Sequence, residues 1–168
     1  LGNVIDPKAL TAQYGLDQTR YFLMREVPFG NDGDFSATAM VHRVNGDLAN
    51  DFGNLCQRVL SMIFKNCDAV MPALPEQPSA IDTKLMTAAD RLLDQVRDML
   101  DRQAFNEALR CIWQVVADAN RYVDTTAPWA LKKTDPKRMS EVLAVLAETI
   151  RQVAILVQPV MPQSATLV

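Results

Sequence analysis

Residues 36–71, SATAMVHRVNGDLANDFGNLCQRVLSMIFKNCDAVM, contain no proline and carry the pattern that decides the fold. Apolar residues recur in steps of three and four, at Val41, Val44, Leu48, Phe52, Leu55, Val59 and Met62. This spacing gathers them on one side of an α-helix. The stretch is therefore predicted to form one amphipathic helix with a single buried stripe.

The same spacing continues towards the C-terminus and predicts three further long helices, over about 80–102, 105–127 and 136–157. The prolines of residues 72–80 should form a stiff connector before the first of them. The helix that begins near residue 105 should end before Pro128, because proline disfavours a helical conformation in the residue before it.

Two shorter helices are predicted before residue 36. Asp6 and Pro7 form a helix start, since aspartate caps a helix and proline suits its first turn, and this helix should stop near Gly15. A second should cover about 17–27, followed by a loop over 28–34. With no alternating strand pattern, the fold class is all-α, an antiparallel helix bundle.

Composition limits the function classes. The formal net charge is -3 and the isoelectric point about 5.1, which argues against capture of nucleic acid by bulk charge. Cys56, Cys67 and Cys111 have no metal-site spacing, so reduced thiols and no metal site are expected. No run reaches membrane-spanning length and no leader is visible. The opening residues LGNV suggest a piece of a longer protein.

A catalytic site is not expected. His42, the single histidine, has no serine or cysteine placed to form a triad, and there is no glycine-rich phosphate loop. His42 is therefore predicted to be a solvated surface residue.

A polar stripe on the long helix is more informative. Asp47, Asn50, Asn54 and Arg58 are three or four residues apart, which at ~100° per residue places them within about 80° of arc. Asparagine offers a donor beside an acceptor and arginine a rigid fork of donors, so both suit the edges of nucleic-acid bases. The pattern alone favours the simpler interpretation, an ordinary exposed helix face with an asparagine cap or an Asn–Arg contact.

The two tryptophans have different expected roles. Trp113 lies on an apolar stripe and is predicted to be core. Trp129 follows Pro128 at a helix break, where its ring could stack on a base or pack on a neighbouring helix. Lys132 and Lys133 could attract phosphates, although acidic neighbours such as Asp124 dilute the field.

Four segments carry a family resemblance: LGNVIDP (1–7), RYFLMREVPFGNDGDFS (20–36), ANDFGNLCQR (49–58) and NRYVDTTAPW (120–129). The first resembles the stretch after the Lys-Met-Ser-Lys-Ser loop of class I aminoacyl-tRNA synthetases in general. The other three resemble methionyl-tRNA synthetases of the bacterial type. Together they span almost the whole chain in order.

The resemblance implies site residues and a domain division. Asn54 and Arg58 match the asparagine and arginine that contact anticodon bases, and Trp129 matches the tryptophan on which the first base of the CAU anticodon stacks. Residues 1–35 would form a connecting helical segment near the tRNA stem. Residues 36–168 would form an anticodon-binding bundle of the class I synthetase type, with no catalytic or metal-binding residue.

For the whole enzyme, the resemblance implies a cytoplasmic methionine–tRNA ligase that uses ATP and Mg²⁺. Its partners would be initiator and elongator methionine tRNA and its own catalytic domain, with no membrane. This chain lacks the nucleotide-binding fold, the Lys-Met-Ser-Lys-Ser loop and the zinc-bearing insertion, so it should be inactive alone and hold no cofactor. Two alternatives remain: the corresponding domain of an isoleucyl, leucyl or valyl enzyme, or a helical protein-interaction module with no RNA role.

Overall fold

The computed structural model describes residues 5–33 and 35–168, in which every regular element is helical, as predicted. The N-terminal part contains α1 (Pro7–Tyr14) and α2 (Leu16–Glu26), followed by α3 (Ala37–Arg43), the π-helix η1 (Val44–Gly53) and α4 (Asn54–Asn66). The remainder contains α5 (Ala80–Asp90), α6 (Leu92–Asp101), α7 (Phe105–Thr126), α8 (Pro128–Thr134), α9 (Pro136–Val157) and α10 (Pro162–Ala165).

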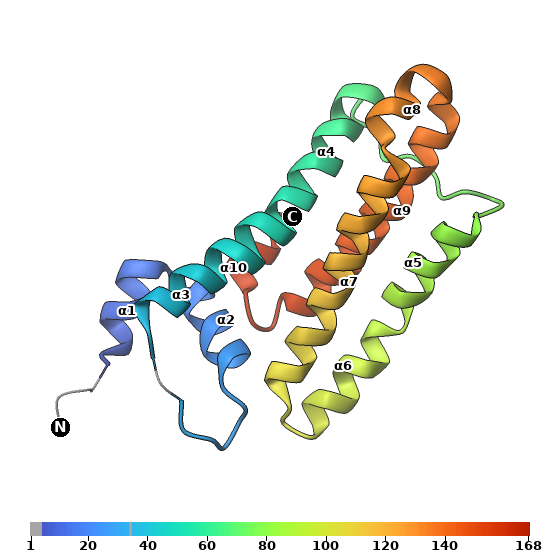
Figure 1. The fold of residues 1–168 in the computed structure, drawn as a ribbon. Coiled ribbons are helices and arrows are strands. Elements are labelled where there is room, and N and C mark those ends of the chain that lie inside the picture. The colour runs from blue at the N-terminus through green and yellow to red at the C-terminus, as the bar shows by residue number, and fades with distance from the viewer. Residues whose placement is uncertain (1–4, 34) are drawn as a thin grey trace.

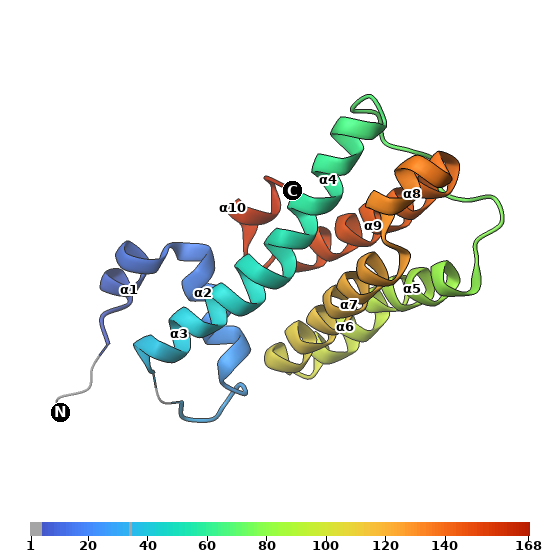
Figure 2. The same cartoon turned by 45° about the horizontal axis from the view of Figure 1, so that its top comes forward.

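The long helices lie side by side and alternate in direction, which confirms the antiparallel bundle (Figure 1). Helices α3, η1 and α4 form one continuous rod along the bundle, and α1 and α2 pack at its beginning (Figure 2). The short α8 sits at the opposite end, beside the far end of α4, where the chain turns from α7 into α9. Segments that are distant in the sequence therefore meet at this end of the bundle.

Helix α9 forms the centre of the core. Its residues Val142, Leu143, Val145 and Leu146 are fully buried between α4, α5, α7 and α8. Full burial of one such side chain stabilises a fold by about 1.5–3 kcal/mol. The central position of α9 holds the surrounding helices in register.

Most predicted helix ends are confirmed. The Asp6 side chain accepts a hydrogen bond from the backbone N–H of Lys8 at 2.9 Å, and α1 ends before Gly15, whose φ of 92° suits glycine. Helix α7 ends before Pro128 at Ala127, a left-handed residue with φ 43°. Such a conformation strains a residue with a side chain.

The prediction of one amphipathic α-helix over residues 36–71 is wrong in two respects. The helix ends at Asn66, five residues before the end of that stretch. The middle of the rod is a ten-residue π-helix, in which each turn contains more residues than an α-turn. The buried stripe consequently does not include Val41, which is 45% exposed, and the neighbouring Met40 is buried instead.

The predicted helix over 80–102 is divided into α5 and α6 at Arg91. Arg91 keeps a right-handed helical backbone, so the buried positions continue through the break from Leu85 and Ala89 to Leu92 and Val96. The break therefore changes the helix bounds without changing the buried face.

Candidate nucleic-acid interface

Arg58 of α4 and Trp129 of α8 lie together at the end of the bundle where α7 turns into α9. The guanidinium carbon of Arg58 is 5.6 Å from the centroid of the Trp129 ring, and 52% of Trp129 remains exposed. This is the geometry of a cation–π contact. Two residues singled out separately in the sequence, 71 positions apart, thus form one surface feature.

Asp124, in the last turn of α7, completes this group. Arg58 Nη2 donates a hydrogen bond to Asp124 Oδ1 at 2.9 Å. The two side chains are 41% and 67% exposed, so the ion pair contributes little to stability, but it orients the guanidinium. Since arginine has five N–H donors, others remain for a ligand. Local pattern identifies Asp124 only as an acidic neighbour of the lysines of α8.

A small hollow of about 170 Å³ lies beside the Arg58–Trp129 contact. Apart from these two residues, its lining is apolar and includes Val59, Val123 and Leu146. As predicted, Trp129 follows the helix break before Pro128, and it is the second residue of the short helix α8, whose first residue, Pro128, is buried. An exposed indole, an apolar hollow and a cationic rim are together suited to a stacked base.

Asn54 extends this surface along α4. It is the first residue of α4, four residues before Arg58 and therefore on the same face, about 6 Å along the helix axis. Asn54 is exposed, as is Asn50 in the preceding π-helix. The amide of Asn54 and the fork of Arg58 can face one ligand.

Asp47 does not belong to this surface, contrary to the predicted stripe. Its carboxylate accepts a hydrogen bond from the Tyr21 hydroxyl at 2.6 Å and pairs with Arg43 at 3.4 Å. Burial, and then the bond to Asp47, raise the pKa of Tyr21 well above its usual value. The stripe was predicted with a rotation of ~100° per residue, which does not apply in the π-helix that carries Asp47. The Asp47 side chain therefore points inward.

Trp113 is a core residue, as predicted. It is 6% exposed, its ring centroid is 4.6 Å from that of Tyr21, and its Nε1 donates to the backbone oxygen of Asp47 at 3.1 Å. The two tryptophans therefore have different roles: Trp113 holds the rod and α7 together, and Trp129 faces solvent.

Few basic residues near the surface formed by Asn54, Arg58 and Trp129 are available to bind phosphates. Arg121 pairs with Asp118 in α7, whereas Lys132 and Lys133 of α8 and Lys65 of α4 are exposed. This modest positive charge agrees with the acidic composition. The predicted surface position of His42 is confirmed, because that residue is exposed.

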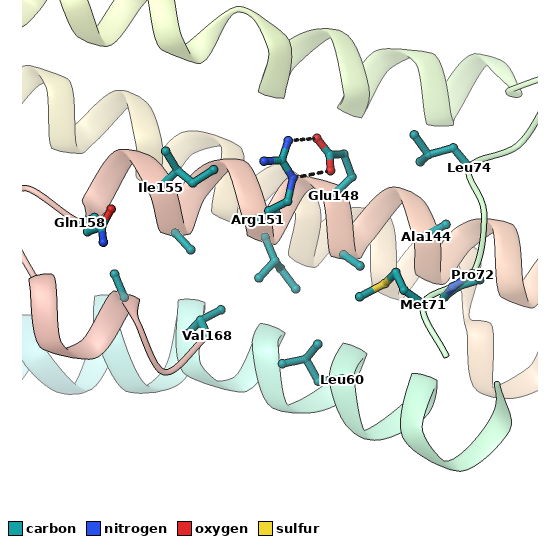
Figure 3. Close-up of a pocket in the computed structure, with 14 residues that line it drawn as sticks. Leu60, Met71, Pro72, Leu74, Ala144, Glu148, Arg151, Ile155, Gln158 and Val168 are labelled. Carbon is teal, nitrogen blue, oxygen red and sulfur yellow. Dashed lines mark hydrogen bonds and ion pairs between the residues drawn. The ribbon is translucent and has the colours of Figure 1, made fainter. Parts of the chain in front are cut away.

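A larger and mostly apolar hollow, of about 360 Å³, lies between α4, α9 and the connector that follows α4 (Figure 3). Leu60 and Val168 line it, and the ion pair between Glu148 and Arg151 lies at its side. It contains none of Asn54, Arg58 and Trp129.

Within residues 5–33 and 35–168, no cluster of side chains could ligate a metal ion, and no helix combines the length and apolar character needed to cross a membrane.

Comparison with known proteins gives the same family over both parts of the chain. The profile described as "tRNA synthetases class I (M)" matches residues 1–60, and "Anticodon binding domain of methionyl tRNA ligase" matches residues 72–168. The methionine–tRNA ligase of Brucella suis is 56% identical over 165 residues, which are 98% of this chain and 32% of that protein. The ligase of Mycobacterium leprae is 49% identical, with 98% and 31% covered.

Solved structures of Mycobacterium tuberculosis methionyl-tRNA synthetase share the fold. The apo form superposes with a TM-score of 0.94 at 47% identity, covering 97% of this chain and 34% of that one. The complex with methionyl-adenylate gives a TM-score of 0.96 and covers 99% and 33%. The chain thus spans about a third of the length of these relatives.

Proposed function

Since this chain belongs to the family of methionyl-tRNA ligase anticodon-binding domains, we propose that its bundle binds the CAU anticodon of methionine tRNA through Asn54, Arg58 and Trp129. The bases of an anticodon loop are single-stranded, so their faces and edges are open to side chains. Trp129 would stack on the first base, and Asn54 and Arg58 would form hydrogen bonds with base edges.

The observation that carries this proposal is the contact between Arg58 and Trp129. Trp129 is half exposed, with the Arg58 guanidinium over its ring at 5.6 Å from the centroid and an apolar hollow beside it, so the exposed part of the ring would be the surface on which a base stacks. Stacking platforms beside cationic groups are the usual means of binding unpaired bases. An ordinary protein-interaction module does not need this arrangement.

The proposal extends to the whole protein. It would attach methionine to initiator and elongator tRNA with ATP and Mg²⁺, in the cytoplasm, with its own catalytic domain as a covalent partner. Residues 1–35 would connect that domain to the anticodon-binding bundle of residues 36–168. The class I match over residues 1–60 supports a link to the catalytic domain, but it runs past residue 35 and does not mark this boundary. The relatives named above are methionine ligases, which favours methionine over isoleucine, leucine or valine.

Replacing Arg58 is expected to reduce both affinity and discrimination. Arg58→Ala removes the fork that faces the bases and should weaken binding of methionine tRNA by roughly 1–3 kcal/mol. It should weaken binding of an anticodon-swapped tRNA much less, as measured by filter binding. An equal loss for both tRNAs would instead identify Arg58 as a phosphate contact.

Replacing Trp129 tests the stacking role. Trp129→Ala should reduce tRNA affinity by about 1–3 kcal/mol, the value of one stacked base, with the largest loss for tRNAs whose first anticodon base is cytosine. Trp129→Phe should recover part of the loss, because a smaller ring still stacks. If Trp129→Ala unfolds the chain while affinity per folded molecule is unchanged, the stacking role is wrong.

A further inference from the structure

A buried carboxylate that the proposed site does not use bonds to residues at both ends of the segment that carries Trp129. Asp82, in the first turn of α5, is 0% exposed. Its Oδ1 accepts hydrogen bonds from the Tyr122 hydroxyl and from Arg138 Nη2, each at 2.6 Å. Its Oδ2 accepts from Arg138 Nη1 at 2.7 Å and from the Ser79 backbone N–H at 2.9 Å.

The carboxylate is therefore fully satisfied, and each donor comes from a different part of the chain. Tyr122 belongs to α7, Arg138 to α9, and Ser79 ends the connector from α4. Burial alone would raise the pKa of the Asp82 carboxyl, but the bonds from Arg138, Tyr122 and Ser79 hold it well below its usual range. Asp82 is thus charged, and its bonds to Tyr122 and Arg138 are charge-assisted and directional.

Tyr122 and Arg138 enclose one segment of the interface. Residues 123–137 run from the end of α7 through α8 to the first turn of α9, and they include Asp124 and Trp129. The segment contains the left-handed Ala127, a strained conformation that surrounding contacts must maintain. Asp82 binds the residue just before this segment and the residue just after it.

We propose that Asp82, Tyr122 and Arg138 form a positioning cluster that fixes residues 123–137, so that Trp129 and Asp124 are presented to Arg58. The inference rests on the proposed function, because the segment matters to RNA only if Trp129 and Arg58 bind it. None of the three cluster residues touches the ligand. They act through the two ends of the segment.

The chain supplies a matched control, because a second tyrosine makes the same bond at the other end of the bundle. The Tyr21 hydroxyl donates to Asp47 Oδ2 at 2.6 Å, and Tyr21 is 0% exposed where Tyr122 is 3% exposed. Tyr122→Phe and Tyr21→Phe each delete one buried hydroxyl bonded to a carboxylate. A purely structural role predicts similar consequences for both.

The experiment compares these variants by ¹⁹F NMR of the chain labelled with 5-fluorotryptophan, and by affinity for a CAU anticodon stem-loop per folded molecule. Trp129→Phe assigns the two signals. Tyr122→Phe should shift or broaden the Trp129 signal and weaken stem-loop binding about tenfold, which corresponds to about 1.4 kcal/mol. Tyr21→Phe should perturb the Trp113 signal, since these rings are 4.6 Å apart, and leave the Trp129 signal and the affinity unchanged.

An unchanged Trp129 signal in Tyr122→Phe, or equal losses of affinity in both variants, would overturn the positioning role. Failure of the proposed function gives a different result: the unaltered chain then shows no preference for the CAU stem-loop. Because the Trp129 signal is recorded without RNA, it tests the positioning cluster in that case as well.

Discussion

Trp113→Ala is expected to lower the free energy of unfolding by about 3–5 kcal/mol, the usual cost of truncating a buried tryptophan. For a domain of this size, that loss lowers the melting temperature by roughly 6–20 °C. The indole packs against Tyr21 and Phe52, and its Nε1 bonds to the backbone oxygen of Asp47. The substitution therefore creates a cavity and leaves a carbonyl group without its partner.

A thermal melt followed by circular dichroism checks this result, with Trp129→Ala as the control. Trp129 is 52% exposed, so its truncation should leave the melting temperature nearly unchanged. A loss below about 1 kcal/mol for Trp113→Ala, where a buried aromatic is expected to cost several times more, would contradict its place in the core.

Asp82→Asn is expected to have a comparable effect on stability. Removing one partner of a buried ion pair costs about 3–5 kcal/mol, because the other charge loses its main partner. Arg138 would keep only its longer contact with Glu141, at 3.5 Å. The amide also turns an N–H towards groups that donate to the carboxylate, Tyr122 and Arg138. Chemical denaturation at neutral pH measures the loss.

The control for this variant is Asp98→Asn. Asp98 also pairs with an arginine, Arg102, but both side chains are more than half exposed. An exposed pair contributes at most about 1 kcal/mol, so Asp98→Asn should change stability little. Equal losses of stability in the two variants would show that burial of the Asp82 cluster adds nothing to the free energy of unfolding.

The same carboxylate determines an acid dependence. The pKa of Asp82 is lowered in the folded chain, so its contribution is present above the unfolded pKa, about 3.9, and is lost as pH falls towards the folded pKa. The difference in stability between the unaltered chain and Asp82→Asn should therefore be constant near neutrality and shrink below about pH 4. A difference that grows on acidification would refute this linkage.

Much of the fold was predictable from local pattern. The stripes of α7 and α9, the cap at Asp6 and the helix end before Pro128 all follow from neighbouring residues, and the structure confirms them. The π-helix was not predictable, because its apolar residues Val44, Leu48 and Phe52 are four positions apart, a spacing that an α-helix also produces. That error misplaced Asp47 and Val41.

The candidate site was predicted only as separate residues. Spacing and family resemblance both selected Arg58 and Trp129, but their contact depends on how α4 and α8 pack. The Asp82 cluster was missed for the same reason. Tyr122 and Arg138 follow Asp82 by 40 and 56 positions in the sequence, and each of the three looks like a surface residue when considered alone.

Titration of the 5-fluorotryptophan-labelled chain with RNA measures whether Trp129 stacks on the first base of a CAU anticodon. Two stem-loops are compared, one with CAU and one with only the first anticodon base changed. We expect the CAU stem-loop to bind more tightly and to shift the Trp129 signal strongly, while the buried Trp113 signal stays in place. Equal affinity for the two stem-loops, with a Trp129 signal that does not move, would contradict this expectation.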